Sequence, residues 1–361
     1  MKAASTRCRT TLTCTALAVS LISAGCGGGN SSSSSNTQPP PTPPSLSSGG
    51  ASSVYVVEHP LSGNGSSILQ FSATANGPVA PSSTLTLPSG FIVTCVATDT
   101  LGQIYVGGEL SSPITTGEVL IYAAGSTGAA TPTRTITGGL GVLYAPQSMV
   151  VDSSGQLYVL TGYTNIDGVV VYASNANGAA TPVRTIQGSL TLFEVDGEAL
   201  ALDHAGTIYV ATLGVGGAAG QVYAFASGLG GNVVPTRTIA STSTGSGNIF
   251  ALDTDSAGNL YVVGLAPGLP IVSTIYEFSA TASGTATPIR TIAGTYASLA
   301  YVRSLHIDAA GNIYIAAATT AQVPYIAAFA STASGNIGSS ISFASSAFAD
   351  TAIGSYQLAL K

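Results

Sequence analysis

The amino-acid sequence predicts an all-β fold in which six four-stranded antiparallel blades form a closed ring. Charged residues make up only 7% of the 361 residues, and 44 glycines and 18 prolines favour short strands and tight turns over helices. A Tyr-Val or Tyr-Ile dipeptide returns about every fifty residues, which indicates a repeated supersecondary unit. The six tyrosines are Tyr55, Tyr105, Tyr158, Tyr209, Tyr261 and Tyr314.

One complete unit can be read from the third copy. A turn that begins with Asp and ends with Gly precedes five of the six tyrosines, because Asp bonds the backbone ahead of it and Gly accepts a positive φ. Each such turn is expected to join two strands in a hairpin, and four strands make one blade of a six-bladed β-propeller. The third copy predicts strands at 147–151, 156–160, 169–173 and 182–186, with turns at 152–155 and 175–178.

The fourth strand of the unit carries its own signature, Pro-x-Arg-Thr-Ile. Proline cannot donate to a strand ladder, so this strand is expected at the outer edge of the blade. Because the arginines return with the period of the fold, we expect them to serve structure rather than catalysis. They are Arg134, Arg184, Arg237 and Arg290.

The two ends of the domain complement one another. The segment Tyr356–Leu360 resembles the first strand of a blade, yet no second strand follows it. The domain begins at Ser53–Val57 with a second strand that has no first strand before it. We therefore expect these segments to pair and to close the ring, which removes edges that would promote aggregation.

These turn and Tyr-Val motifs resemble those of the NHL-repeat family and of the related gluconolactonase-like six-bladed propellers. The resemblance covers residues 53–361. It implies the fold strongly and the function weakly, because propellers carry out many unrelated tasks.

The N-terminus has the pattern of a bacterial export signal. Basic residues precede a mildly apolar stretch at 11–24, which is too short to span a bilayer. The following Ser23-Ala24-Gly25-Cys26 resembles a lipoprotein cleavage site, although Ser23 stands where that family usually has Leu. We expect a signal peptide at 1–25 and a lipidated Cys26; ordinary cleavage after Ala24 is the alternative.

Residues 26–52 are rich in Gly, Ser and Pro and predict a disordered tether between the anchor and the domain. The protein is therefore expected outside the cytoplasm, at the outer membrane or cell surface. Removal of the three bases in the signal peptide leaves six basic residues against fifteen acidic ones. Such a surface excludes charge-driven binding to nucleic acid or to an anionic membrane.

One position recurs five residues before each turn aspartate and is expected at the mouth of the central channel, on the face that carries the longer loops. Its occupants mix several chemistries and predict a pocket for a small polar ligand; a water-filled funnel is the alternative. The residues are Thr94, Gln147, Glu198, Phe250 and Arg303, with Tyr356 at the matching place in the C-terminal strand.

Other candidate groups are few. Glu194, Asp196 and Glu198 alternate along one segment and could bind a divalent cation such as calcium weakly, or could form a solvated loop. Cys95 lies in an apolar run and predicts a buried, inert thiol. No catalytic residue is assigned, because no nucleophile or zinc motif is present. The histidines His59, His204 and His306 lack metal-ligand spacing.

The sequence therefore favours a monomeric, membrane-anchored binding or scaffold module that presents its loop face to a protein or carbohydrate partner. No cofactor is expected beyond the weakly bound cation. A metal-dependent lactonase or related hydrolase with its site at the channel mouth is the alternative. A purely structural surface protein is a third interpretation.

Overall fold

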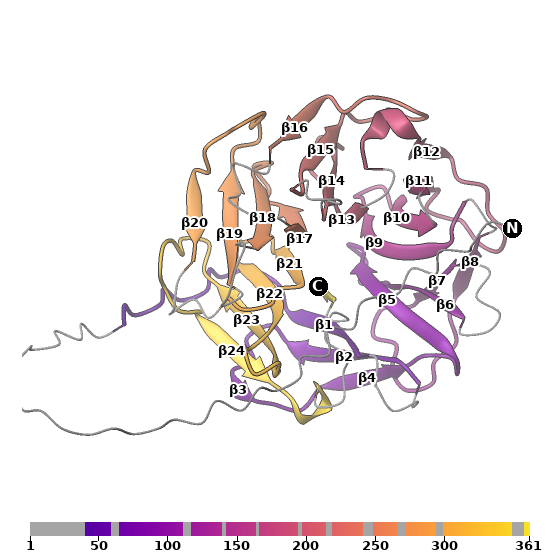
Figure 1. Ribbon diagram of the computed structural model, residues 1–361. Coiled ribbons are helices and arrows are strands. Elements are labelled where there is room, and N and C mark those ends of the chain that lie inside the picture. Colours follow the sequence, from indigo (N-terminus) through magenta and orange to yellow (C-terminus); the bar gives the residue numbers. More distant parts are fainter. Residues whose placement is uncertain are drawn as a thin grey trace, which may run out of the picture. The chain divides into compact units, whose positions relative to one another are not determined.

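The structure, a computed structural model, shows six β-sheets arranged as blades around a common centre (Figure 1). Each blade has four antiparallel strands, and the sixth gains one short parallel strand. The predicted six-bladed β-propeller is thereby confirmed. The structure describes residues 40–58, 65–110, 117–138, 142–163, 166–193, 197–213, 219–240, 248–265, 272–293, 299–348 and 357–361.

Each blade takes its strands in chain order from the channel outward, except that the innermost strand of blade 1 comes from the C-terminus. Blades 1 to 3 contain, in this order, β25 (Leu358–Leu360), β1 (Ser53–Glu58), β2 (Ser67–Ser72), β4 (Ser83–Thr86); β5 (Phe91–Thr98), β6 (Ile104–Leu110), β7 (Gly117–Tyr122), β8 (Arg134–Thr137); β9 (Ala145–Val151), β10 (Leu157–Tyr163), β11 (Ile166–Tyr172), β12 (Arg184–Gln187). Blades 4 to 6 contain β13 (Gly197–Leu202), β14 (Ile208–Thr212), β15 (Val222–Phe225), β16 (Arg237–Ile239); β17 (Asn248–Thr254), β18 (Leu260–Leu265), β19 (Ser273–Phe278), β20 (Arg290–Ile292); β21 (Ser304–Ile307), β22 (Ile313–Ala318), β23 (Pro324–Phe329), β24 (Ile341–Ala344) and the added β3 (Gly77–Pro78). Two 3-10 turns complete the described elements, η1 (Ser189–Thr191) and η2 (Ser346–Phe348).

The Asp-to-Gly turns form the hairpins that the sequence predicts. In blade 3, Oδ1 of Asp152 accepts hydrogen bonds from the backbone of Ser154 and Gln156, both at 2.9 Å. Gly155 closes the turn at a φ of +81°, where a side chain would be strained. The other four turns repeat this geometry. The short turns that join the first to the second strand and the third to the fourth strand of each blade lie on one face of the ring, called here the turn face.

The hydrophobic core is divided into six clusters, each of which lies between two neighbouring blades. The recurring tyrosines are all at most 5% exposed, so each belongs to one of these interfaces. Between blades 6 and 1, for example, Phe71 packs against the rings of Phe343 and Phe348 at 5.1 and 5.4 Å. Stability therefore depends on contacts between blades, because no single sheet buries its faces alone.

The outer edge of every blade pairs in parallel with a glycine of the next blade, through an isolated bridge at five interfaces and through the two-residue strand β3 at the sixth. Ile136 of β8 faces Gly178 in blade 3, where the amide of Gly178 donates to the carbonyl of Thr135 at 2.6 Å. All six bridging glycines have a φ between +61° and +84°. The six bridges are Leu85–Gly128, Ile136–Gly178, Ile186–Gly231, Ile239–Gly284, Ile292–Gly335 and Phe343–Gly77. The fourth strand of each blade, predicted as a free edge, is thus covered at one point.

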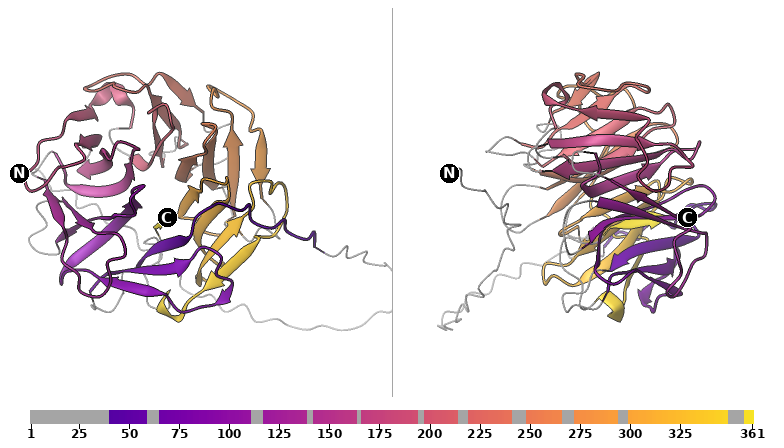
Figure 2. Two further views of the ribbon diagram at one scale, coloured as in Figure 1. Left: turned by 180° about the vertical axis from the view of Figure 1, so that it is seen from behind. Right: turned by 90° about the vertical axis from the view of Figure 1, so that its right-hand side faces the viewer.

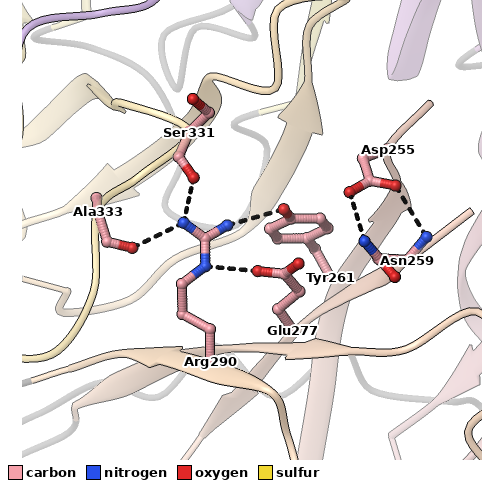
Figure 3. Close-up of polar contacts among 7 residues, drawn as sticks. All are labelled: Asp255, Asn259, Tyr261, Glu277, Arg290, Ser331 and Ala333. Atoms are coloured by element: carbon pink, nitrogen blue, oxygen red, sulfur yellow. Dashed lines mark hydrogen bonds and ion pairs between the residues drawn. The ribbon is translucent and has the colours of Figure 1, made fainter. Parts of the chain in front are cut away.

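Arginines reinforce this seam. Arg290 donates to Glu277 and Tyr261 of its own blade and to the carbonyls of Ser331 and Ala333 in the next blade (Figure 3). Its guanidinium also lies over the Tyr261 ring, 5.7 Å from the centroid. The structure therefore assigns a clear structural role to this rim arginine.

Side chains tie the inner edges together in the same way. The Oγ atoms of Ser148 and Ser304 accept hydrogen bonds from the amides of Leu200 and Leu358 in the following blades, both at 3.2 Å. Each innermost strand pairs with one strand only, so these bonds satisfy polar groups that would otherwise face the channel unpaired.

The C-terminal strand closes the ring as predicted. Residues 358–360 of β25 pair antiparallel with Val54, Tyr55 and Val56 of β1. Leu358 is fully buried and Ala359 is 2% exposed. Figures 1 and 2 show the C-terminus at the centre of the ring, beside the channel.

The last part of the predicted tether contacts the domain. The backbone of Ser47 exchanges two hydrogen bonds with the side chain of Asn312, and the amide of Ala51 donates to Asp308. Ser340 donates to the carbonyl of Pro44. Residues 44–51 therefore pack over the turn between β21 and β22 of blade 6, which shortens the segment that we propose as a tether to 26–43. Within the described part of the chain, no helix has the length and apolar character that crossing a membrane requires.

Removing residues 357–361 is expected to unfold or aggregate the domain. The deletion exposes the inner edge of β1 and removes Leu358, whose full burial stabilises the fold by about 1.5–3 kcal/mol. A typical domain has only about 5–15 kcal/mol of stability in total. Thermal melts of the two forms measure the effect.

Leu358→Ala and Leu101→Ala provide a matched pair for the same claim. The first is expected to cost about 2–4 kcal/mol, and the second, 73% exposed, less than about 0.5 kcal/mol. Equal melting temperatures for the truncated and full-length chains would contradict ring closure by β25.

Candidate functional site

The predicted channel-mouth residues occupy β-bulges. In β5, Val93 pairs with Gly108 and Cys95 pairs with Gly107, so no residue of β6 stands opposite Thr94 in the strand register. A bulge re-aims the extra side chain and bends the strand. The same one-residue bulge occurs at Gln147 of β9, Glu198 of β13 and Phe250 of β17.

Arg303 follows the same rule at the start of β21. Its amide donates to the carbonyl of Ala316 at 2.9 Å, and Ala316 also pairs with Ser304. Two residues thus oppose one, which is the arrangement of a bulge. The sixth predicted position, Tyr356, lies outside the described residues.

Three of the five described positions meet. Glu198, Phe250 and Arg303 line a cavity of about 20 Å³ in the channel. A cavity of that size accommodates about one water molecule or one polar group. The guanidinium carbon of Arg303 lies 4.4 Å from the centroid of the Phe250 ring, a cation–π contact.

Arg303 is the electrostatic centre of this cavity. Burial lowers the pKa of its guanidinium, and the nearby carboxylate of Glu198 partly opposes that shift. Among the described residues, its Nε atom is buried without a hydrogen-bond acceptor. An unpaired buried donor is costly, so this N–H can donate to an oxygen acceptor that enters the cavity, such as a water molecule or a polar group of a ligand.

Thr94 and Gln147 do not join the cavity. The Thr94 hydroxyl donates to the carbonyl of Pro146 in the next blade. The amide of Gln147 lies against Gly162 of its own blade, 2.5 Å from where a Cβ would stand. The sequence reveals the shared position of these residues, but the bulge turns their side chains in different directions.

The predicted metal site stays untested. Glu194 and Asp196 lie outside the described residues, and only Glu198 can be placed. Within the described ranges, no three His, Cys, Asp or Glu side chains are grouped closely enough to hold a metal ion. Weak calcium binding by this segment remains a prediction.

Two residues that the sequence analysis did not identify as a pair, Asp253 and His306, lie on the innermost strands β17 and β21. Nδ1 of His306 is 3.2 Å from Oδ2 of Asp253, which also accepts the amide of Ile307. Both residues stand two positions before a turn aspartate, one blade apart. The sequence could have revealed this pair, because the two residues hold the same position in neighbouring repeats. Equivalent positions on adjacent innermost strands lie close together.

Cys95 also lines the cavity, and its chemistry is that of a buried thiol. Burial raises its pKa to about 12, while contacts with Thr94 and Gly107 oppose that shift. At neutral pH the sulfur is therefore protonated and a poor nucleophile.

Iodoacetamide at pH 8 is expected to leave Cys95 unmodified in the folded protein. Unfolding removes the desolvation that raises the pKa, so the same residue should alkylate in denaturant. Peptide mapping by mass spectrometry reads this position separately from the other cysteines. Rapid modification of Cys95 in the native chain would show a reactive thiol instead.

The comparisons with known proteins concern the fold. No protein-family model matches the chain, and no curated protein matches it. A protein of unknown function from Bacteroides caccae is 10% identical, with a TM-score of 0.55 over 85% of this chain and 98% of that one.

Two further similar structures have TM-scores below 0.5. A WD40 domain from Toxoplasma gondii coronin is 9% identical, with a TM-score of 0.44 over 83% of this chain and 65% of that one. A Lactobacillus plantarum protein is 12% identical, with a TM-score of 0.46 over 86% and 98% of the two chains. The resemblance to NHL-repeat proteins therefore stays a prediction.

Proposed function

We propose that this chain is an envelope-anchored binding module that receives one polar group of a partner at the channel mouth. The observation that carries this proposal is the Arg303 guanidinium, stacked on Phe250 with an unpartnered buried Nε among the described residues. The propeller supplies a rigid frame for this group, because the strand that carries it is fixed on both sides by neighbouring blades.

The size of the cavity favours a protein partner over a carbohydrate at this site. About 20 Å³ accommodates a single carboxylate or amide group but not a sugar ring. A protein can insert one side chain there while the surrounding surface contributes the remaining contacts. An acidic or amide side chain offers the oxygen that the Arg303 Nε–H lacks.

The hydrolase alternative has less support. It requires a bound metal at the channel mouth, and Glu194 and Asp196, which could contribute ligands, lie outside the described residues. The NHL-like resemblance is compatible with either function, because it concerns the scaffold.

Acetate, a mimic of an acidic side chain, is expected to shift the Nε–H resonance of Arg303 in a ¹⁵N NMR titration. Arg290 is the internal control, because its Nε already donates to Glu277. The shift should disappear in Arg303→Lys, which keeps the charge and loses the Nε–H. A resonance of Arg303 that does not respond to acetate or acetamide would refute the proposed site.

A photo-reactive residue at Gln357, which lines the cavity, is expected to cross-link one envelope protein in intact cells. The cross-link should fall strongly in an Arg303→Met background, because the polar contact is lost. Cross-linking to glycan, or a yield unaffected by Arg303→Met, would contradict a protein partner at this site.

The anchor is part of the same proposal, with a signal peptide at 1–25, a lipid on Cys26 and a tether at 26–43. Cys26→Ser is expected to abolish incorporation of labelled palmitate and to release the protein from the membrane fraction. Cys95→Ser is the matched control and should change neither readout. Absence of palmitate from the wild-type chain would refute the lipoprotein assignment.

A further inference from the structure

One rim arginine does not perform the role of the others. Arg134, Arg237 and Arg290 each donate to a backbone carbonyl of the following blade. Within the described part of the chain, Arg184 donates only to the hydroxyl of Tyr158, at 3.1 Å, and lies 5.5 Å over its ring. Its Nε and Nη1 donors are therefore available at the interface of blades 3 and 4.

The cause lies at Gly230 in the facing turn. Gly230 directly precedes the bridging Gly231, and the equivalent residues at the other three interfaces that have a rim arginine all carry side chains. A Cβ on Gly230 would stand 2.9 Å from Cγ of Arg184, so the arginine stem occupies space that a side chain fills elsewhere. The residues equivalent to Gly230 are Asn177, Ser283 and Ser334.

A groove opens beside the available guanidinium. It has a volume of about 530 Å³ and lies on the turn face between blades 3 and 4. That volume falls in the range of small-molecule sites. The polar groups that line it include Asp152, Tyr158, Arg184, Asp203 and His204.

The interface of blades 5 and 6 shows why this groove differs. A groove of about 390 Å³ lies there beside Arg290. All three nitrogens of that guanidinium donate to protein oxygens, as Figure 3 shows. A groove beside a rim arginine therefore does not by itself make a binding site. At Arg184, the groove lies beside guanidinium nitrogens that make no hydrogen bond to the described residues.

The charges of the groove indicate the class of ligand. Two carboxylates and one guanidinium leave it with excess negative charge when His204 is neutral, which disfavours phosphate or carboxylate groups. The Oδ1 atoms of Asp152 and Asp203 accept turn amides, and Oδ2 of Asp203 also accepts the Tyr209 hydroxyl at 3.2 Å, so the carboxylates are held in place. A hydroxyl group can donate one hydrogen bond and accept others. A ligand with neighbouring hydroxyl groups could therefore donate to the fixed carboxylates and accept from the Arg184 guanidinium at the same time.

We propose that this groove binds a neutral carbohydrate through adjacent hydroxyls held between Arg184 and the turn carboxylates of Asp152 and Asp203. The site lies on the turn face, apart from the Arg303 cavity, and does not depend on the function proposed for that cavity. The groove is open, and the Tyr158 ring is already covered by Arg184, so binding of a single sugar is weak.

Saturation-transfer NMR on the purified chain tests this proposal. The probes are the methyl glycosides of mannose, galactose, glucose and fucose, with inorganic phosphate and glucuronate as anionic comparisons. At least one neutral glycoside is expected to bind. Arg184→Met keeps the stem over Tyr158 but removes the donors, and it should weaken binding about tenfold.

Gly230→Asn is the second variant, because it restores the side chain that Asn177 supplies in the preceding interface. It should displace Arg184 and weaken the same glycoside. Arg290→Met is the matched control, because Arg290 lies at the interface of blades 5 and 6 and does not line this groove. It should leave glycoside binding unchanged, with circular dichroism confirming that every variant is folded.

Three results would overturn the proposal. These are the absence of transfer to every neutral glycoside, unchanged affinity in folded Arg184→Met, or binding of phosphate and glucuronate in place of the glycosides. Loss of acetate binding at Arg303 with glycoside binding retained would separate the failure of the proposed function from the failure of this site.

Discussion

Every blade of this protein has two sheet edges, and the ring is stable only if both are satisfied by the neighbouring blades. The inner edge is met by side chains such as Ser148 and Ser304, which accept amides of the next blade. The outer edge is met by a single parallel bridge to a glycine in a turn. Because the chain has so few charged residues, hydrogen bonds of this kind and apolar packing determine most of the specificity with which neighbouring blades pair.

Both sites follow from local departures from this pattern. At the inner edge, bulges interrupt the ladder in the five blades whose bulge position is described, and the side chain of Arg303 stacks there on Phe250. At the outer edge, Gly230 presents no side chain beside Arg184, and among the described residues Arg184 makes none of the bonds to carbonyls of the next blade that Arg290 makes. Both proposed binding positions thus lie where one repeat of the scaffold differs from the others.

The sequence predicted the strands and turns that repeat in every blade. It did not predict the directions of the bulged side chains, which differ from blade to blade. Tyr-Val strands, Asp-to-Gly turns and closure by the C-terminal strand have local signatures in residues that must be buried or adopt a positive φ. The channel-mouth position was also found by its spacing. Alternation along a strand cannot show where a bulged side chain points, so the divergence of Thr94 and Gln147 from Arg303 required coordinates.

The hydrogen-bond partners of the rim arginines could not be predicted from the sequence either. Their period correctly indicated a structural role, yet the four are identical in sequence context and differ in their partners. The difference at Arg184 arises about fifty residues later, at Gly230, in a turn that only the folded ring brings close to it. Contacts of that kind are set by packing between repeats rather than within one.

Native-state hydrogen exchange of the bridging glycine amides tests the claim that the blades are held as one closed unit. The amides of Gly128, Gly178, Gly231, Gly284 and Gly335 donate across the seam at 2.6–2.7 Å, although they lie in surface turns. If the ring is a single cooperative structure, all five exchange only through global unfolding, with free energies equal to that of the whole domain. Exchange of any one of them through local opening, about 2 kcal/mol or more below the global value, would show that the seam does not hold the ring together.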